Sequence, residues 1–194
     1  MTTDIAAGST VEKIINVALD MVQRRGFMGF SFRDIAAEVG IKTASIHYHF
    51  PTKPDLARAV LSEVRGGFEL ELARIDREVD GIEQKLRAFV EIFDDTFGDG
   101  DRLCPFCMVA CAQDGVPDFV REEVQGFWSA GEQWVANLVE LGKSTGSFHR
   151  ALDPAASGRV LVAMLEGAMA TARAFDDRSR LHGAADWFLA QLKA

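Results

Sequence analysis

Apolar residues recur every three or four positions along almost the whole chain of 194 residues, and no segment alternates apolar and polar residues as a half-buried strand does. This spacing places the apolar side chains of each segment on one face of a helix. Hydrophobic residues make up 48% of the sequence and charged residues 26%, a balance typical of a globular protein and unlike a disordered one. The sequence therefore predicts an all-α protein with a buried core.

Helix start and stop signals divide the first third of the chain into short helices. Ser9–Glu12 and Ser31–Asp34 have the spacing of capping boxes, in which the cap residue and the side chain three positions later bond each other's backbone. We expect the two helices that they open to end at Gly26 and Gly40. A third short helix is expected over residues 43–49, after a turn of two or three residues. Three short helices joined in this way are typical of a helix-turn-helix unit.

The rest of the chain is predicted to form longer helices. They are expected to begin near residues 51–54, 82, 105, 117 and 153, and a last helix is expected to contain residues 187–192. The helix over residues 153–175 is apolar on almost every side, so every side needs to be covered.

We therefore expect a two-fold homodimer in which that helix and the last one form a four-helix interface. The alternative is a central helix in the bundle of a monomer. The residues predicted to lie at the dimer interface are Leu161, Leu165, Ala168, Ala172, Phe188 and Leu192.

Charge is distributed unevenly along the chain. The net charge is −8, yet residues 1–60 hold seven Lys or Arg and six Asp or Glu, whereas residues 61–194 hold fourteen and twenty-three. Because phosphate repels acidic surfaces, only the first third is suited to approach a nucleic acid. No apolar run reaches the roughly 18 residues of a membrane span, and residues 1–9 lack the basic segment of a signal peptide. We expect a cytoplasmic protein with no membrane partner.

The segment 40–56 reads Gly-Ile-Lys-Thr-Ala-Ser-Ile-His-Tyr-His-Phe-Pro-Thr-Lys-Pro-Asp-Leu. It resembles the signature of the TetR family of bacterial transcriptional repressors, in which Gly-Val-Ser-x-Gly-x-Leu-Tyr-x-x-Phe precedes a Lys at the start of the next helix. The strong similarity covers residues 10–60. It implies a helix-turn-helix DNA-binding domain over residues 1–56 and a helical ligand-binding and dimerisation domain over residues 57–194.

The resemblance also implies which residues contact DNA. In a helix-turn-helix, the start of the second helix enters the major groove while neighbouring groups hold phosphates. Ile46 and Phe50 are expected to be core residues. The candidate DNA-binding residues are Ser31, Arg33, Lys42, Thr43, Ala44, Ser45, His47, Tyr48 and Lys53.

His47 departs from the family pattern, which usually has Tyr at this position. A protonated imidazole binds phosphate better than a neutral one, so one hypothesis is that DNA affinity rises modestly as the pH falls from 8 to 6. The alternative is that His47 only packs or hydrogen-bonds locally.

The three cysteines, Cys104, Cys107 and Cys111, lie within eight residues, which does not suit a secreted disulfide framework. Three interpretations stay open. The thiols are buried core residues; or Cys104 and Cys107 form a redox sensor, with Cys104 activated at a helix N-terminus, as in TetR-like repressors that respond to electrophiles; or they bind a metal, for which a fourth ligand is missing. We predict no metal site and no cofactor.

The C-terminal region is rich in aromatic and sulfur-containing residues. Most are expected to be core, and some to line an apolar cavity that binds a small-molecule inducer. Polar candidates there are His149, Arg159, Glu166 and Arg173. The candidate ligand-binding residues are Phe89, Phe93, Phe106, Phe127, Trp128, Trp134 and Met164.

Together these features predict a ligand- or redox-responsive regulator that binds a palindromic operator in double-stranded DNA as a dimer. Two other classes of protein are alternatives. A di-iron helical-bundle enzyme would need Glu-x-x-His pairs, and no histidine of the chain has Glu three positions before it. An adaptor of the same fold that does not bind DNA is the second alternative.

Overall fold

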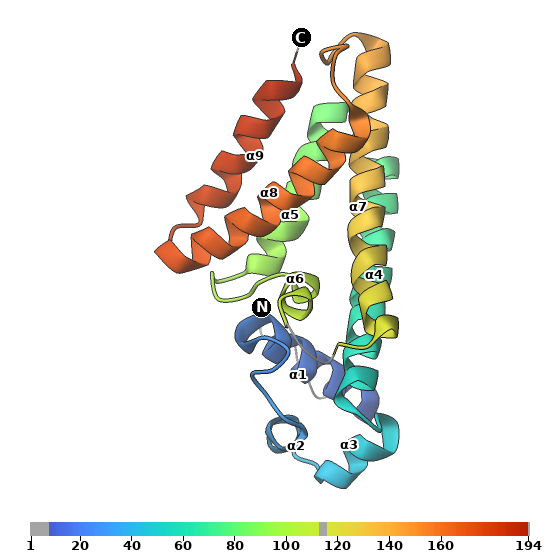
Figure 1. The fold of residues 1–194 in the computed structure, drawn as a ribbon, viewed down its shortest axis with the longest axis vertical. Coiled ribbons are helices and arrows are strands. Elements are labelled where there is room, and N and C mark those ends of the chain that lie inside the picture. Colours follow the sequence, from blue (N-terminus) through green and yellow to red (C-terminus); the bar gives the residue numbers. More distant parts are fainter. Residues whose placement is uncertain (1–7, 113–115, 194) are drawn as a thin grey trace. The chain divides into compact units, whose positions relative to one another are not determined.

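The computed structural model of the chain describes residues 8–112 and 116–193. In this part of the chain there are nine α-helices and, apart from one isolated bridge between Phe148 and Lys193, no β-structure, so the all-α prediction is confirmed. The helices are α1 (Thr10–Arg25), α2 (Phe32–Val39), α3 (Thr43–His49), α4 (Lys53–Glu78), α5 (Ile82–Phe97), α6 (Pro105–Ala110), α7 (Asp118–Thr145), α8 (Pro154–Phe175) and α9 (Ser179–Leu192) (Figure 1). None of the helices in the described ranges is both long and apolar enough to cross a membrane.

The described residues form two compact units. The N-terminal unit comprises residues 8–65, 105–112 and 116–124, and the C-terminal unit comprises residues 66–104 and 125–193. Helices α4 and α7 therefore each contribute residues to both units. Each unit has its own set of buried apolar side chains.

The helix boundaries follow the start and stop signals of the sequence. The Ser9 hydroxyl accepts a hydrogen bond from the Glu12 backbone N–H at 3.2 Å, and the Glu12 carboxylate accepts one from the Ser9 N–H at 2.7 Å. Gly26 ends α1 with a backbone φ of 80°, which glycine adopts without steric cost. At α8, the Asp153 carboxylate accepts from the Ala156 N–H at 3.2 Å, and Pro154 occupies the first turn.

In the N-terminal unit, α1 packs against α2 and α6, and α2 packs against α3. The buried side chains come from every helix of the unit and from the segment between α1 and α2. They include Ile14, Ala18 and Val22 of α1, Phe27 and Phe30 of the connection, Ile35 of α2, Ile46 of α3 and Leu56 of α4. Burial of these residues fixes which face of each short helix is turned to solvent.

In the C-terminal unit, α8 and α9 lie side by side (Figure 1) and both pack against α5. Helix α8 also passes very close to α7: a Cβ atom on Gly158 would lie 2.2 Å from the Glu132 carbonyl oxygen. Arg178, just before α9, donates at 2.8 Å to the Asp94 carboxylate of α5 and at 2.6 Å to the Gly98 carbonyl. These contacts attach the start of α9 to the end of α5.

The structure corrects the residues predicted for the dimer interface. All six are buried within the single chain, where α8, α9 and α5 pack on one another. They are Leu161, Leu165, Ala168, Ala172, Phe188 and Leu192. A second copy of the chain could contact α8 and α9 only on their other faces.

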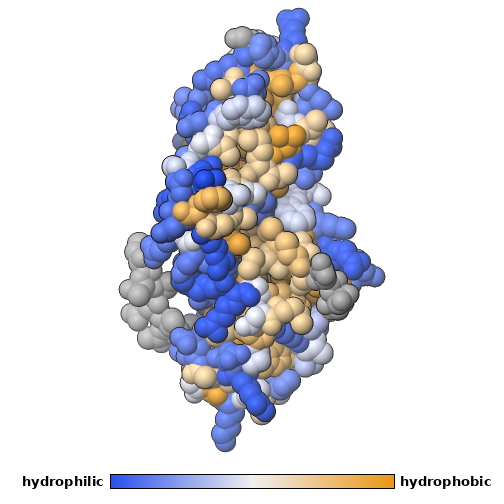
Figure 2. All heavy atoms as spheres, turned by 60° about the vertical axis from the view of Figure 1, so that its left-hand side comes forward, coloured by the Kyte–Doolittle hydropathy of each residue, from blue (hydrophilic) through white to orange (hydrophobic). Residues whose placement is uncertain are grey.

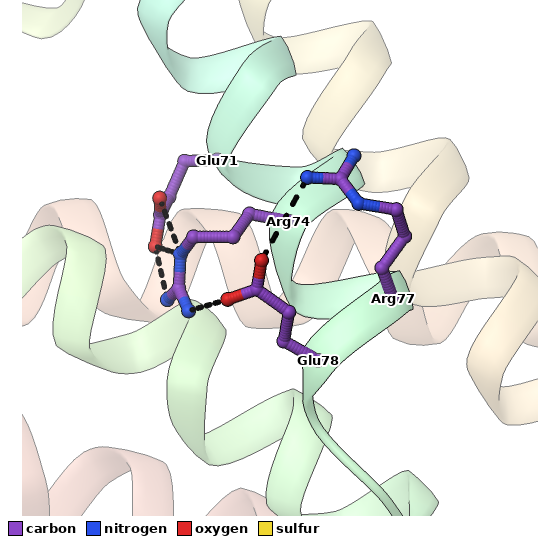
Figure 3. Close-up of polar contacts among 4 residues, drawn as sticks. All are labelled: Glu71, Arg74, Arg77 and Glu78. Atoms are coloured by element: carbon purple, nitrogen blue, oxygen red, sulfur yellow. Dashed lines mark hydrogen bonds and ion pairs between the residues drawn. The ribbon is translucent and has the colours of Figure 1, made fainter.

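An ion-pair cluster lies on the exposed side of α4 in the C-terminal unit (Figure 3). Arg74 lies between two carboxylates, with nitrogen–oxygen distances of 2.6 Å to Glu71 and 3.1 Å to Glu78. Hydrogen bonds that Arg74 donates to Glu71 and Glu78 raise the pKa of its guanidinium above the ordinary value. Glu78 also lies 3.8 Å from Arg77. Exposed pairs of this kind stabilise a helix only slightly, because water and salt screen the charges.

Candidate nucleic-acid interface

The turn between α2 and α3 is fixed by Gly40. Its φ of 77° and ψ of 33° lie in the left-handed region, and nothing lies within 4 Å of the position that a Cβ atom would occupy. Glycine is therefore needed here for its backbone conformation and not for space. The backbone N–H groups of Gly40 and Ile41 both donate to the Ala36 carbonyl at 3.0 Å, which closes α2 and starts the short turn into α3.

Ser31 and Arg33 lie at the start of α2 and are both exposed. The Ser31 N–H and hydroxyl each donate to the Asp34 carboxylate at 2.7 Å. These two hydrogen bonds lower the pKa of Asp34 below its ordinary value. The cap thus fixes the backbone at Ser31 and leaves the Arg33 side chain in solvent, where it could meet a phosphate.

Helix α3 is attached to the core by one side chain and presents the others outward. Ile46 is completely buried, and Phe50, which follows the helix, is buried as well, as the sequence predicts. Lys42, the residue that caps α3, is exposed, and Tyr48 is 84% exposed. Of the other candidates on α3, Ala44 and His47 are exposed, and Thr43 and Ser45 are partly exposed. His49, also exposed, was not among the predicted residues.

His47 is held on the surface of the unit by two neighbours. Its Nδ1 lies 3.3 Å from the Pro51 carbonyl oxygen, and its ring meets the Phe32 ring edge-on with centroids 4.8 Å apart. If Nδ1 carries the proton that this carbonyl accepts, the exposed Nε2 of a neutral His47 is an acceptor. Only the protonated ring could then donate a hydrogen bond to phosphate.

Lys53 has a different environment from the other DNA-binding candidates. Its ammonium donates to the Phe30 carbonyl and lies 4.1 Å and 5.1 Å from the ring centroids of Phe30 and Phe27. Burial lowers the pKa of Lys53, and the charge of Asp34 acts in the opposite direction. The Lys53 side chain is therefore directed toward the interior of the unit, whereas the sequence predicted that it would contact phosphate.

An open pocket of about 510 Å³ lies beside the end of α3 in the N-terminal unit. Its lining holds both signs of charge, from Asp55, Glu123 and Arg58, and Arg58 also lies over the Phe119 ring at 5.0 Å. The remaining lining residues are His49, Phe50, Pro51, Ala59 and Ser62. None of the predicted ligand-binding residues is among them.

The structure brings most of the predicted ligand-binding aromatics together in the C-terminal unit. Phe89 stacks on Trp134 with centroids 5.5 Å apart and lies 5.4 Å from Phe93. Phe127 joins this cluster through Phe68, at 4.6 Å. Phe68 was missed by the sequence reasoning, although its spacing from the buried residues Leu72 and Ile75 would have placed it on the same helix face.

The remaining ligand-binding candidates are more scattered. Trp128 donates from its indole nitrogen to the Glu166 carboxylate at 3.0 Å, and Trp134 donates to Asp76 at 2.9 Å. Met164 is partly exposed on α8. Phe106 is buried on α6 and belongs to the N-terminal unit, whereas the other predicted ligand-binding residues belong to the C-terminal unit.

The cysteines differ in exposure in a way that the sequence did not indicate. Cys104, the favoured thiol of the sensor interpretation, is only 3% exposed, whereas Cys107 is partly exposed and Cys111 is exposed. The sensor interpretation needs an accessible thiolate at Cys104, so the burial of this residue favours the core interpretation for it. Within the described ranges, no three His, Cys, Asp or Glu side chains form a group suited to a metal ion.

The fold and the exposed face of α3 define an all-helical protein with a helix-turn-helix unit. The family of bacterial regulatory proteins of the tetR type matches residues 14–60, and the C-terminal domain described as tetracyclin repressor-like matches residues 82–188. The second match alone spans more than half of the chain, so the chain belongs to the TetR family. The family consists of transcriptional regulators and not of enzymes.

Individual relatives agree with this assignment. The chain is 31% identical over 96 residues to the HTH-type transcriptional regulator CymR of Pseudomonas putida, and 22% identical over 192 residues to the A-factor receptor protein of Streptomyces griseus. These matches cover 47% and 94% of this chain but only 47% and 62% of the relatives' own lengths. A TetR-family regulator structure from Agrobacterium tumefaciens superposes with a TM-score of 0.89 at 27% identity, over 95% of this chain and 97% of that one.

Proposed function

We propose that the protein is a dimeric, ligand-responsive repressor that binds a palindromic operator in the cytoplasm. The observation that carries the proposal is the outward face of α3, where Lys42 and Tyr48 extend into solvent while Ile46 anchors the helix. The first residues of such a helix fit the major groove. Ser31 and Arg33, at the exposed start of α2, are placed to contact the phosphate backbone. Residues 1–56 serve as the DNA-binding domain in this proposal.

A stripe of small and apolar residues on the outer face of α8 and α9 supports the dimer. Five of the exposed residues of α8 follow one another at alternating steps of three and four: Val160, Ala163, Gly167, Ala170 and Ala174. On α9 the matching positions are Gly183, Trp187 and Ala190. We call these eight residues the outer stripe. Figure 2 shows a face of the molecule on which apolar side chains gather among hydrophilic ones.

The spacing and composition of the outer stripe suit a helix–helix contact. Steps of three and four residues form the seam of paired helices. Nothing lies within 4 Å of the Cβ position of Gly167 or Gly183, so neither glycine is required by packing inside the chain. Trp187 is 59% exposed, which is unusual for so large a side chain. A second copy of the chain would cover all of these positions at once.

The inducer site of the proposal is the aromatic cluster of the C-terminal unit. Stacked rings such as Phe89 and Trp134 suit a flat, apolar ligand, and the Glu166 carboxylate supplies a polar group beside Trp128. One relative is named as the A-factor receptor protein, and a receptor function in a relative supports ligand control here. Operator and inducer binding would oppose each other by linkage.

The proposal is tested by incubating the protein with a randomised pool of DNA duplexes and sequencing the duplexes that it retains. We expect an inverted repeat whose half-sites lie about one helical turn, or a multiple of it, apart. Retention of no sequence at low salt would contradict DNA binding and would favour an adaptor of the same fold. Retention of single half-sites would contradict the dimer.

A further inference from the structure

Lys53 is the first residue of α4, a position where a positive charge gains nothing from the helix. The N-terminus of a helix carries a partial positive charge and favours carboxylates. Asp55 fills that role, because its carboxylate accepts hydrogen bonds from the Thr52 hydroxyl at 2.6 Å and from the Thr52 N–H at 3.1 Å. The Lys53 ammonium must therefore find its stabilising contacts outside α4.

Those contacts all lie in residues 26–31, the connection between α1 and α2. The ammonium donates to the Phe30 carbonyl and lies over the rings of Phe30 and Phe27. Both phenylalanines are buried in the core of the N-terminal unit. A cation held by a carbonyl and two aromatic faces is attracted by each of them, and partial burial strengthens these interactions.

The same connection determines where α2 begins. Residue 30 immediately precedes Ser31, the cap residue whose carbonyl accepts the N–H groups of Asp34 and Ile35 at 3.1 Å and 3.3 Å. The Asp34 carboxylate favours the charged form of Lys53, so the ammonium and the first turn of α2 also interact electrostatically. Lys53 thus attaches the start of α4 to the start of α2.

We propose, on the basis of the DNA-binding function proposed above, that Lys53 is a positioning residue and not a phosphate contact. It fixes the connection 26–31 against α4 and so sets Ser31 and Arg33 in register with α3. A phosphate contact would require the ammonium to leave the Phe30 carbonyl and both rings. The contribution of Lys53 to operator binding therefore passes through Arg33.

The first test uses the full-length protein without DNA. Lys53→Met keeps the length of the side chain and removes the charge, and amide hydrogen exchange is followed by mass spectrometry or NMR. We expect the amides of Asp34 and Ile35 to exchange about tenfold faster than in the wild type, because local opening of the first turn of α2 becomes easier. The exchange rates of amides in the interior of α1 should be unchanged. Unchanged protection at these amides would overturn the proposal. Lys53→Arg, which keeps a cation over the rings, should restore protection and serves as the second variant if Lys53→Met does not fold.

The second test measures binding to the duplex that the wild type retains from a randomised pool. Lys53→Met should weaken binding about tenfold without changing its salt dependence. Lys42→Met, the matched control at the exposed cap of α3, should make the negative slope of log K against log salt shallower by about one. Arg33→Ala should weaken operator binding about tenfold when it is introduced into the wild type. Introduced into the Lys53→Met variant, it should weaken binding less than about threefold, because a mispositioned Arg33 already contributes little to binding.

The proposal would be overturned if Lys53→Met made the salt slope shallower by about one and if the effects of Lys53→Met and Arg33→Ala were additive. These results together would identify a direct phosphate contact. If the wild type retains no duplex, the DNA-binding function fails, but the exchange measurement still decides the role of Lys53.

Discussion

The exposed faces of α3 and α8 differ in chemistry and in how far the sequence determines them. Helix α3 and its cap residue Lys42 expose the side chains of Lys42, His47 and Tyr48 around a single buried anchor, Ile46. Helix α8 is apolar inside and outside, so its sequence does not state which face belongs to the core. A polar helix with one anchor has only one way to pack, whereas a helix that is apolar all round has several.

Side-chain size separates the two faces of α8. The inner face carries large residues such as Leu161, Leu165 and Met169, and the outer stripe carries mainly alanine and glycine. Large side chains fill the space between the helices of a core, whereas small ones allow two helices of neighbouring molecules to approach closely. Because both faces are apolar, a hydrophobicity pattern does not distinguish the face with large side chains from the face with small ones.

The largest expected effect comes from a charge placed on the outer stripe. Ala170→Glu should convert the dimer into a monomer at micromolar concentration and weaken operator binding by more than about 100-fold, because the two half-sites are no longer bound jointly. Light scattering and DNA titration check this. Ala155→Glu, an exposed position of α8 outside the stripe, is the control and should change neither. If the Ala170→Glu protein remains a dimer, the dimer interface does not include the outer stripe.

A core substitution on the opposite face of α8 should lower stability and leave the dimer intact, the reverse of what is expected for Ala170→Glu. Leu165→Ala should lower the free energy of unfolding by about 2–5 kcal/mol, because it leaves a cavity in the packed interior. The native protein should remain dimeric and bind DNA. Chemical denaturation together with light scattering makes the comparison, and loss of the dimer without loss of stability would place Leu165 at the interface after all.

Substitutions on α3 should weaken DNA binding without affecting the fold. Lys42→Ala and Tyr48→Ala each remove an exposed side chain from the helix, so the thermal transition and the dimer should be unchanged. Each should lose about 10- to 100-fold in operator affinity, the range of one base or phosphate contact. Wild-type affinity in both variants would contradict the docking of α3 in the groove.

The contact between α5 and the start of α9 should make stability depend on pH. Hydrogen bonds from Arg178 are the main reason why the pKa of Asp94 lies below its ordinary value of 3.8, and His182, 3.4 Å away, acts in the same direction. Because the folded state favours the charged carboxylate, its stabilising contribution is present above about pH 4 and is lost as the pH falls through the lowered pKa.

Asp94→Asn should therefore destabilise the protein by about 1–2 kcal/mol near neutral pH, a modest figure because Arg178 is half exposed. The difference from the wild type should shrink below pH 4. Urea unfolding at several pH values provides the measurement. A difference that stays constant down to pH 3 would show that the ionised carboxylate is not what stabilises the contact.

The smallest expected effect concerns His47. The hypothesis is tested by lowering the pH from 8 to 6, because a protonated imidazole can donate from both ring nitrogens. Operator affinity should rise about two- to threefold more in the wild type than in His47→Gln, measured at constant ionic strength. Parallel pH profiles for the two proteins would leave His47 with only its local contacts to Pro51 and Phe32.

The sequence predicted local structure better than side-chain environment. Caps and turns such as Ser9–Glu12, Asp153 and Gly40 act within a few residues, so their effect is visible in the sequence. The inward position of Lys53 depends on Phe27 and Phe30, more than twenty residues away along the chain, and the burial of Cys104 depends on tertiary packing. Such contacts cannot be inferred from spacing alone.

We propose that α3 binds DNA while the outer stripe pairs two chains. This proposal is tested most directly by the mass of the complex that the protein forms with its selected duplex, measured by analytical ultracentrifugation. We expect two chains on each inverted repeat for the wild type, two for Ala155→Glu and none or one for Ala170→Glu. One wild-type chain per duplex, or no complex at low salt, would contradict it.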